Sequence, residues 1–177
     1  MGKKKNSYEE YLFVDGYNII NAWSNLKELS KISLEVAREE LIEIMAEYQS
    51  FTGVKVIIVF DAHMVKGNSG KKENIKGVDV IYTRERETAD QYIEKVLDEI
   101  GREKTVKVAT SDWLEQQIVL GRGGTRLSAR ELEVQVKNMK RTLNRRITTV
   151  DVKNELLIGG LDEDAIEKLS KWTKNNK

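Results

Sequence analysis

The sequence contains no cysteine and no proline among its 177 residues. Without cysteine the chain can form no disulfide, no thiolate metal site and no cysteine nucleophile, and such a composition fits a reducing compartment. Proline normally makes up about 5% of a chain, so its absence leaves glycine as the main residue that ends helices and forms turns. We therefore expect a cytoplasmic protein without sulfur-based chemistry.

Long apolar runs and an excess of one charge are also missing. The apolar runs fall far short of the roughly 20 residues that a membrane-spanning helix needs, and residues 1–7 are basic with no apolar segment behind them, unlike a secretory signal. Thirty Lys and Arg residues balance 29 Asp and Glu residues, so any attraction to nucleic acid must come from a local surface. With 40% hydrophobic and 33% charged residues, the composition predicts a soluble globular protein without a membrane partner.

Strand and helix patterns alternate along the chain. Short apolar runs typical of buried strands occur at 11–14, 54–60, 78–82 and 105–110. Apolar residues at helical spacing follow at 34–48, 89–100, 112–120 and about 128–146, and Ser33, Thr88 and Ser128 are the expected helix caps. We expect a loop at 66–76 and a Gly-Arg-Gly-Gly loop at 121–124. This alternation predicts an α/β fold with a mostly parallel sheet and right-handed crossovers.

The same pattern predicts how the chain is organised. Residues 1–8 are expected to be a flexible basic tail and residues 9–150 a single α/β domain. Residues 151–177 are expected to be a helical extension packed on the same domain, with a last helix near 162–174.

Four aspartates follow the predicted strands. Asp15, Asp61 and Asp112 come after the first, second and fourth strands, and Asp90 lies in the first turn of the helix after the third. Each alone would serve as a turn or cap residue. In open parallel sheets, however, ligands bind outside the carboxyl ends of the strands, so all four should lie at one edge. Clustered carboxylates favour a bound Mg²⁺ or Mn²⁺.

Other acidic α/β sites fit less well. A phosphoaspartate phosphatase needs a second aspartate where this chain has Tyr17. A receiver domain needs a second acid before Asp15 and a lysine where residues 123–128 offer Arg126. The phosphate-binding and dinucleotide-binding glycine motifs are absent. Metal-assisted hydrolysis at phosphorus is the chemistry that remains favoured.

Five ordered motifs together resemble the YacP-like NYN-domain ribonucleases, a branch of the PIN-like nucleases, over about residues 10–147. The motifs are Val14-Asp15-Gly16-Tyr17-Asn18, Val59-Phe60-Asp61-Ala62-His63, Glu87-Thr88-Ala89-Asp90, Ala109-Thr110-Ser111-Asp112 and Ser128-Ala129-Arg130-Glu131-Leu132. The resemblance implies a PIN-like three-layer α/β/α sandwich and a ribosome-associated, metal-dependent endoribonuclease that cuts mRNA during translation. It also implies that Asp15, Asp90 and Asp112 are the catalytic metal-binding acids, with Asp61 as a fourth acid at the rim.

Basic residues gather where the net charge does not reveal them. Between residues 122 and 146, eight positive residues face two negative ones, a local net charge of +6. A cationic stripe on a helix is often only a solvated face, but the single sign favours a track for the RNA backbone. The candidate RNA-binding residues are Asn18, His63, Arg84, Arg86, Arg122, Arg126, Arg130, Lys137, Arg141 and Arg145.

Several of these candidates have structural alternatives. Asn18 would equally cap a loop, His63 would be structural or exposed, and Arg84 and Arg86 would offset neighbouring glutamates. Glu94, one turn after Asp90, either leans into the acidic pocket or pairs with a nearby lysine.

We therefore expect a monomeric endoribonuclease that uses Mg²⁺ or Mn²⁺, takes mRNA as its substrate and the ribosome as its partner, and has no small-molecule cofactor. Two other functions remain open at this point: a non-catalytic RNA- or ribosome-binding module on the same fold, and a toxin-type PIN ribonuclease.

Overall fold

The computed structural model describes residues 10–65, 67 and 70–159, with side chains as far as Lys153. The chain divides after Val136 into two compact units. The first unit contains the strands β1 (Glu10–Asp15), β2 (Lys55–Phe60), β3 (Lys72–Ile75), β4 (Val78–Tyr82), β5 (Thr105–Thr110) and β6 (Thr125–Ser128). The expected basic tail and the expected helix near 162–174 lie outside the described residues.

The helices are α1 (Gly16–Ala22), α2 (Ser24–Ile32), α3 (Leu34–Thr52), the short 3₁₀ helix η1 (Ala62–Met64), α4 (Ala89–Ile100), α5 (Trp113–Gly121) and α6 (Ala129–Gly159). The last of these begins in the first unit and continues into the second. Within the described part of the chain, no helix is both long and apolar enough to cross a membrane.

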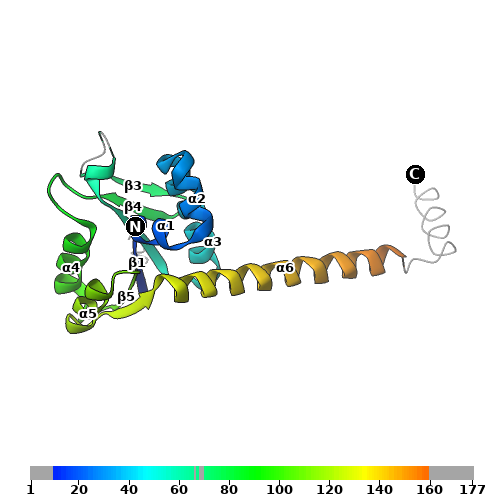
Figure 1. Ribbon diagram of the computed structural model, residues 1–177. Coiled ribbons are helices and arrows are strands. Elements are labelled where there is room, and N and C mark those ends of the chain that lie inside the picture. The colour runs from blue at the N-terminus through cyan, green and yellow to red at the C-terminus, as the bar shows by residue number, and fades with distance from the viewer. Residues whose placement is uncertain (1–9, 66, 68–69, 160–177) are drawn as a thin grey trace, which may run out of the picture. The chain divides into compact units, whose positions relative to one another are not determined.

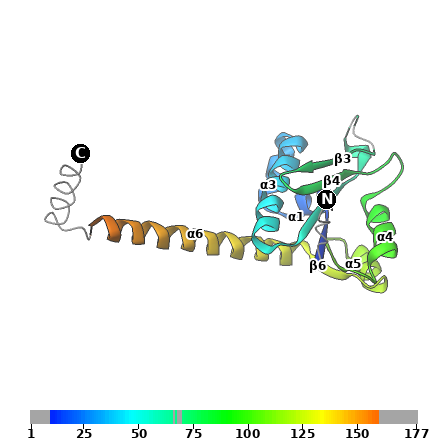
Figure 2. The ribbon, with the colours of Figure 1, turned by 180° about the vertical axis from the view of Figure 1, so that it is seen from behind.

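The described strands form one sheet in the order β3-β4-β2-β1-β5-β6, in which only the β3–β4 pair is antiparallel. Helices α2 and α3 lie on one side of the sheet and α4 and α5 on the other (Figures 1 and 2). In the register, Asp15 pairs with Val59 and Thr110 pairs with Ser128, so the parallel strands end together. The predicted PIN-like α/β/α sandwich with a mostly parallel sheet is confirmed.

The central strands are buried on both faces. Phe13, Ile57 and Val59 pack with Ile93 and Leu97 of α4 in one hydrophobic cluster. The alternate strand residues, such as Leu12, Val14 and Ile58, are also almost fully buried. Burial on both faces explains why these strands are continuous apolar runs in the sequence.

The predicted helix boundaries rest on side-chain caps. The Ser33 hydroxyl accepts a hydrogen bond from the Val36 amide, and Gly53 ends α3 in the left-handed conformation at φ 77°. Thr88 and Gln91 form the expected capping box at α4. Ser128 forms the equivalent reciprocal pair with Glu131 at α6.

Other local predictions were incomplete or wrong. The expected loop at 66–76 contains β3, and strand β6, just after the expected loop at 121–124, was not predicted, nor were helices α1 and α2. Strands β3 and β6 are short and lie at the two sheet edges, and only half of their side chains are exposed, without an apolar run. They are held by backbone hydrogen bonds to a neighbouring strand, so they carry no continuous apolar signal. Helix α6 also continues well past residue 146, to Gly159.

Candidate metal centre

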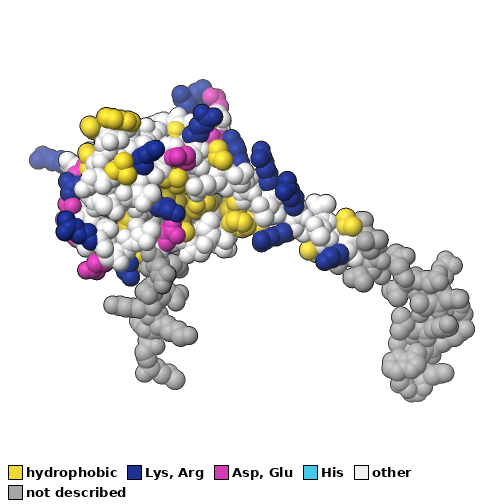
Figure 3. Space-filling model, turned by 90° about the horizontal axis from the view of Figure 1, so that it is seen from below, with side chains coloured by type: hydrophobic (Ala, Val, Ile, Leu, Met, Phe, Trp, Pro, Cys, Tyr) yellow, Lys and Arg dark blue, Asp and Glu magenta, His cyan; other side chains and the backbone are white. Residues whose placement is uncertain are grey.

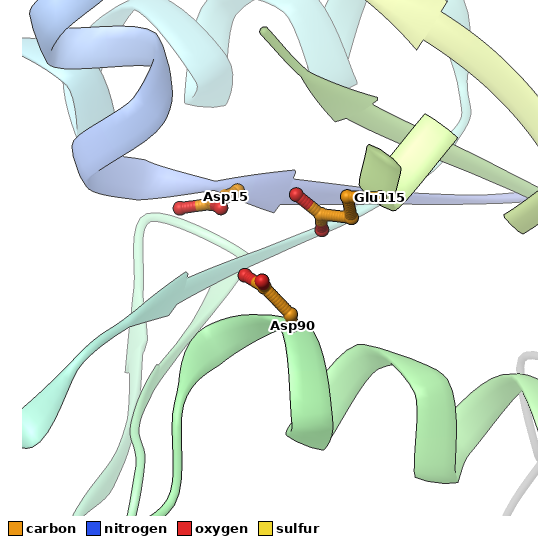
Figure 4. Close-up of side chains that lie close together, drawn as sticks. All are labelled: Asp15, Asp90 and Glu115. Carbon is orange, nitrogen blue, oxygen red and sulfur yellow. The ribbon is translucent and has the colours of Figure 1, made fainter. Parts of the chain in front are cut away.

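Three carboxylates from three elements converge at the carboxyl edge of the sheet. Asp15 ends β1, Asp90 lies in the first turn of α4, and Glu115 lies in the first turn of α5. One carboxylate oxygen of each lies within 4.8 Å of the others, and Figure 4 shows the three side chains directed toward one another. Asp15 and Glu115 are buried, and Asp90 is half-buried.

Asp15 is held by the turn between β1 and α1. Its carboxylate caps α1, accepting hydrogen bonds from the Asn18 amide (3.4 Å) and from Asn18 Nδ2 (3.0 Å). The Ser111 hydroxyl in turn donates to Asn18 Oδ1. A Cβ atom at Gly16 would overlap the Phe60 ring, so glycine is required for this close approach. Burial raises the pKa of Asp15 to about 6, while its bonds to Asn18 act in the opposite direction.

Glu115 is the site residue that sequence reasoning missed. Its side chain is buried, and among the described residues neither carboxylate oxygen has a hydrogen-bond partner. Burial raises its pKa to about 8, and the charge of Asp15 acts in the same direction. The pKa of Asp90 is also raised, first by burial and then by Asp61 and Asp112. Its sequence position could have indicated this, because Glu115 follows Asp112 by three residues and lies in the first turn of the helix after β5.

These three residues fit a divalent cation. The buried Glu115 oxygens in particular have no hydrogen-bond donor among the described residues, and a carboxylate there needs a positive partner, because burying a charge without one is costly. Around an octahedral Mg²⁺ with ligands at ~2.1 Å, adjacent oxygens lie about 3 Å apart and opposite ones about 4.2 Å. Oxygens within 4.8 Å of one another would reach one ion after small side-chain rotations. The hard oxygen donor set suits Mg²⁺ or Mn²⁺.

The two other predicted acids lie beside this cluster. Asp112 is exposed and caps α5, its Oδ1 accepting from the amides of Leu114 (2.8 Å) and Glu115 (3.3 Å). Asp61 Oδ1 accepts from the Ala89 amide at 2.7 Å, at the start of α4. Each therefore holds the helix start that presents Asp90 or Glu115. A direct role of Asp112 and Asp61 in metal binding stays a prediction.

The candidate RNA-binding residues differ in their surroundings. Arg122, just after α5, pairs with Glu94 and Asp98 on α4, so Glu94 contacts an arginine. Arg126 lies near Gln116 and Glu131. Most of the candidates have exposed side chains, namely His63, Arg84, Arg86, Arg126, Arg130, Lys137, Arg141 and Arg145. Figure 3 shows Lys and Arg side chains gathered along α6.

Comparison with known proteins places this arrangement in a family. The model of the YacP-like NYN domain matches residues 12–174. The chain belongs to the YacP-like NYN domain family. It is 44% identical over 168 residues to an uncharacterized protein YacP of Bacillus subtilis, covering 94% of this chain and 98% of that protein. A crystal structure of Rae1 (YacP) from Bacillus subtilis matches with a TM-score of 0.70 at 44% identity, over 93% of this chain and 95% of the other.

A crystal structure of a point variant of the same Bacillus subtilis protein matches with a TM-score of 0.68 at 43% identity, over 80% of this chain and 83% of that one. In this YacP-like NYN domain, all five sequence motifs lie where a strand ends or the following helix begins. The five motifs therefore all lie at the carboxyl edge of the sheet, where the acidic cluster is.

Proposed function

We propose that this protein is a divalent-metal-dependent endoribonuclease that cleaves mRNA in association with the translating ribosome. The observation that carries the proposal is the convergence of Asp15, Asp90 and Glu115, whose carboxylate oxygens lie within 4.8 Å of one another. Two of these three side chains are buried. A structural role alone gives no reason to bury acids together, because their charges repel.

The three carboxylates would hold Mg²⁺ or Mn²⁺. Such an ion, when bound, neutralises charge on a phosphate and activates water for in-line displacement. The residues around the site have separate tasks. Asn18 fixes the orientation of the Asp15 carboxylate, while Asp61 and Asp112 fix the starts of α4 and α5. Asp112 remains in the proposal as a further catalytic acid, because it lies close enough to raise the pKa of Asp90.

RNA as the substrate is supported by the exposed cations. Arg84 and Arg86 lie in the loop just before α4, within six residues of Asp90 in the sequence, where they would contact a phosphate near the metal. Lys137, Arg141 and Arg145 form an exposed basic stripe on α6 that suits a phosphate backbone. The resemblance to YacP-like ribonucleases supports mRNA on the ribosome as the substrate, and the proposal therefore takes the cytoplasm as the site of the activity. The proposal takes a monomer as the working unit.

The test is cleavage of labelled mRNA, with and without translating ribosomes, in Mg²⁺, Mn²⁺ or chelator. We expect internal cuts that need the metal and increase with ribosomes, and loss of cleavage by orders of magnitude in Asp90→Asn and Glu115→Gln. Asp98→Asn is the matched control, since it makes the same change on α4 outside the cluster. Binding of RNA or ribosomes without cleavage by the wild type under any of these conditions would instead indicate a non-catalytic module.

A further inference from the structure

A large aromatic side chain is exposed beside the metal centre. Trp113 is the first residue of α5 and is 69% exposed, and its neighbour Leu114 is 64% exposed. Tryptophan normally buries its large apolar surface, and where it remains accessible it is typical of binding surfaces. The cap of α5 does not require a tryptophan, because the Asp112 carboxylate provides it.

The position of Trp113 ties it to the acids. It lies between Asp112, which caps α5, and Glu115, which contributes to the carboxylate cluster. All three residues belong to one helical turn. Residues two apart project from different faces of a helix, so the indole lies on the exposed side of the turn whose buried side carries Glu115.

Cationic and polar groups lie at the same end of α5. Gln116, three residues after Trp113 on α5, is buried, and its Nε2 donates a hydrogen bond to the Thr110 carbonyl at 3.0 Å. The Arg126 guanidinium donates a hydrogen bond to Gln116 Oε1 at 3.2 Å. Gln116 also lines a hollow of about 410 Å³ together with Ser111, Ser128 and Arg130. The hollow thus offers polar contacts for phosphate and ribose groups, and Gln116 places it at the same end of α5 as Trp113.

We propose that Trp113 stacks on an unpaired base of the RNA, next to the phosphate that is cleaved. This inference rests on the proposed function, which brings RNA to the carboxylates. Without a bound cation the acids repel phosphates, whereas an aromatic face attracts an uncharged base without any electrostatic cost. Stacking also accepts every base, because each has a π-face. Trp113 is therefore a positioning residue, and it favours a single-stranded substrate over a duplex.

The test measures binding without cleavage, in the full chain with Asp90→Asn. Anisotropy of a labelled single-stranded RNA gives the affinity, and quenching of tryptophan fluorescence reports stacking. We expect Trp113→Ala to weaken binding roughly 10- to 100-fold, and Trp113→Phe to retain affinity within about threefold while losing most of the quenching. The slope of log Kd against log salt should stay unchanged in Trp113→Ala, since no phosphate contact is removed.

Leu114→Ala is the matched control, because it removes the adjacent exposed apolar side chain and should bind RNA like its parent. Unchanged RNA affinity in Trp113→Ala, or unchanged quenching in Trp113→Phe, would overturn the inference. So would a Trp113→Ala variant that loses affinity for ribosomes but not for free RNA, because the indole would then contact protein. The proposed function fails separately, by absence of metal-dependent cleavage in the wild type.

Discussion

Glu115 combines two properties that rarely occur together in the first turn of a helix: it is acidic, and it is 3% exposed. Burial raises its pKa to about 8, and burial raises the pKa of Asp15 to about 6. The folded, metal-free protein thus holds protons on these groups more tightly than the unfolded chain does. The stability that these two groups contribute is full below about pH 4 and is lost as pH rises toward 8.

The first prediction follows from this loss of stability with rising pH. In chelator, the melting temperature of the wild type should fall between about pH 4 and pH 8, because a tenfold difference in proton affinity between the folded and unfolded states corresponds to about 1.4 kcal/mol. Glu115→Gln should flatten this fall, since the amide has no charge to bury. Added Mn²⁺ should raise the wild-type melting temperature at pH 8 and raise that of Glu115→Gln less. Identical pH profiles for the two proteins in chelator would contradict the account of Glu115.

At the residue scale, the sequence predicted that Asp15 and Asp90 lie close together, as the structure shows, and it did not indicate that Glu115 joins them. The first two directly follow strands or open a helix with an evident capping box, so strand-end reasoning reaches them. Glu115 lies one turn inside a helix, where an acid usually complements the helix dipole. Its burial depends on how α5 packs against β5 and β6, which the local pattern does not encode.

At the scale of elements, the turn from β1 into α1 controls where Asp15 points. The second prediction is that Gly16→Ala lowers stability by about 1–3 kcal/mol, because the new methyl group overlaps the Phe60 ring. Phe60→Leu should recover part of that loss in the double variant, since the leucine leaves space beside residue 16. Denaturant unfolding of the four proteins forms a double-mutant cycle. Additive losses in that cycle would show that the two residues do not compete for space.

The third prediction concerns α6. Replacing Lys137, Arg141 and Arg145 with alanine should weaken RNA or ribosome binding and flatten its salt dependence, because fewer counterions are released. The melting temperature should barely change, since all three side chains are exposed and alanine favours a helix. A salt titration of RNA binding checks this. Binding that is unaltered across the salt series would leave the stripe as a solvated surface.

Some strands and helices could be predicted from the sequence and others could not, and the difference has a physical reason. Strands β1, β2, β4 and β5 lie inside the sheet and are buried on both faces, so their apolar runs identify them. Edge strands β3 and β6 are set by pairing with a neighbour, and α1 and α2 are short helices between two stronger elements. Tertiary contacts, not local pattern, determine these four.

At the scale of the whole molecule, the parallel sheet brings residues that are far apart in the sequence to the same edge. Asp15, Asp90 and Glu115 are separated by up to 100 residues, yet each lies where a strand ends or its helix begins. The family match over residues 12–174 and the 44% identity to the Bacillus subtilis relative agree with that arrangement. On this account, the metal is the reason for bringing three acids together.

Calorimetric titration of the metal-free protein with Mn²⁺ tests this claim most directly, because it needs no RNA and no ribosome. The account predicts that wild type and Asp98→Asn bind the ion with the same affinity. It predicts that Asp90→Asn and Glu115→Gln, each confirmed as folded, bind at least tenfold more weakly, which corresponds to about 1.4 kcal/mol. Equal Mn²⁺ affinity in all four proteins, or no binding by the wild type, would contradict it.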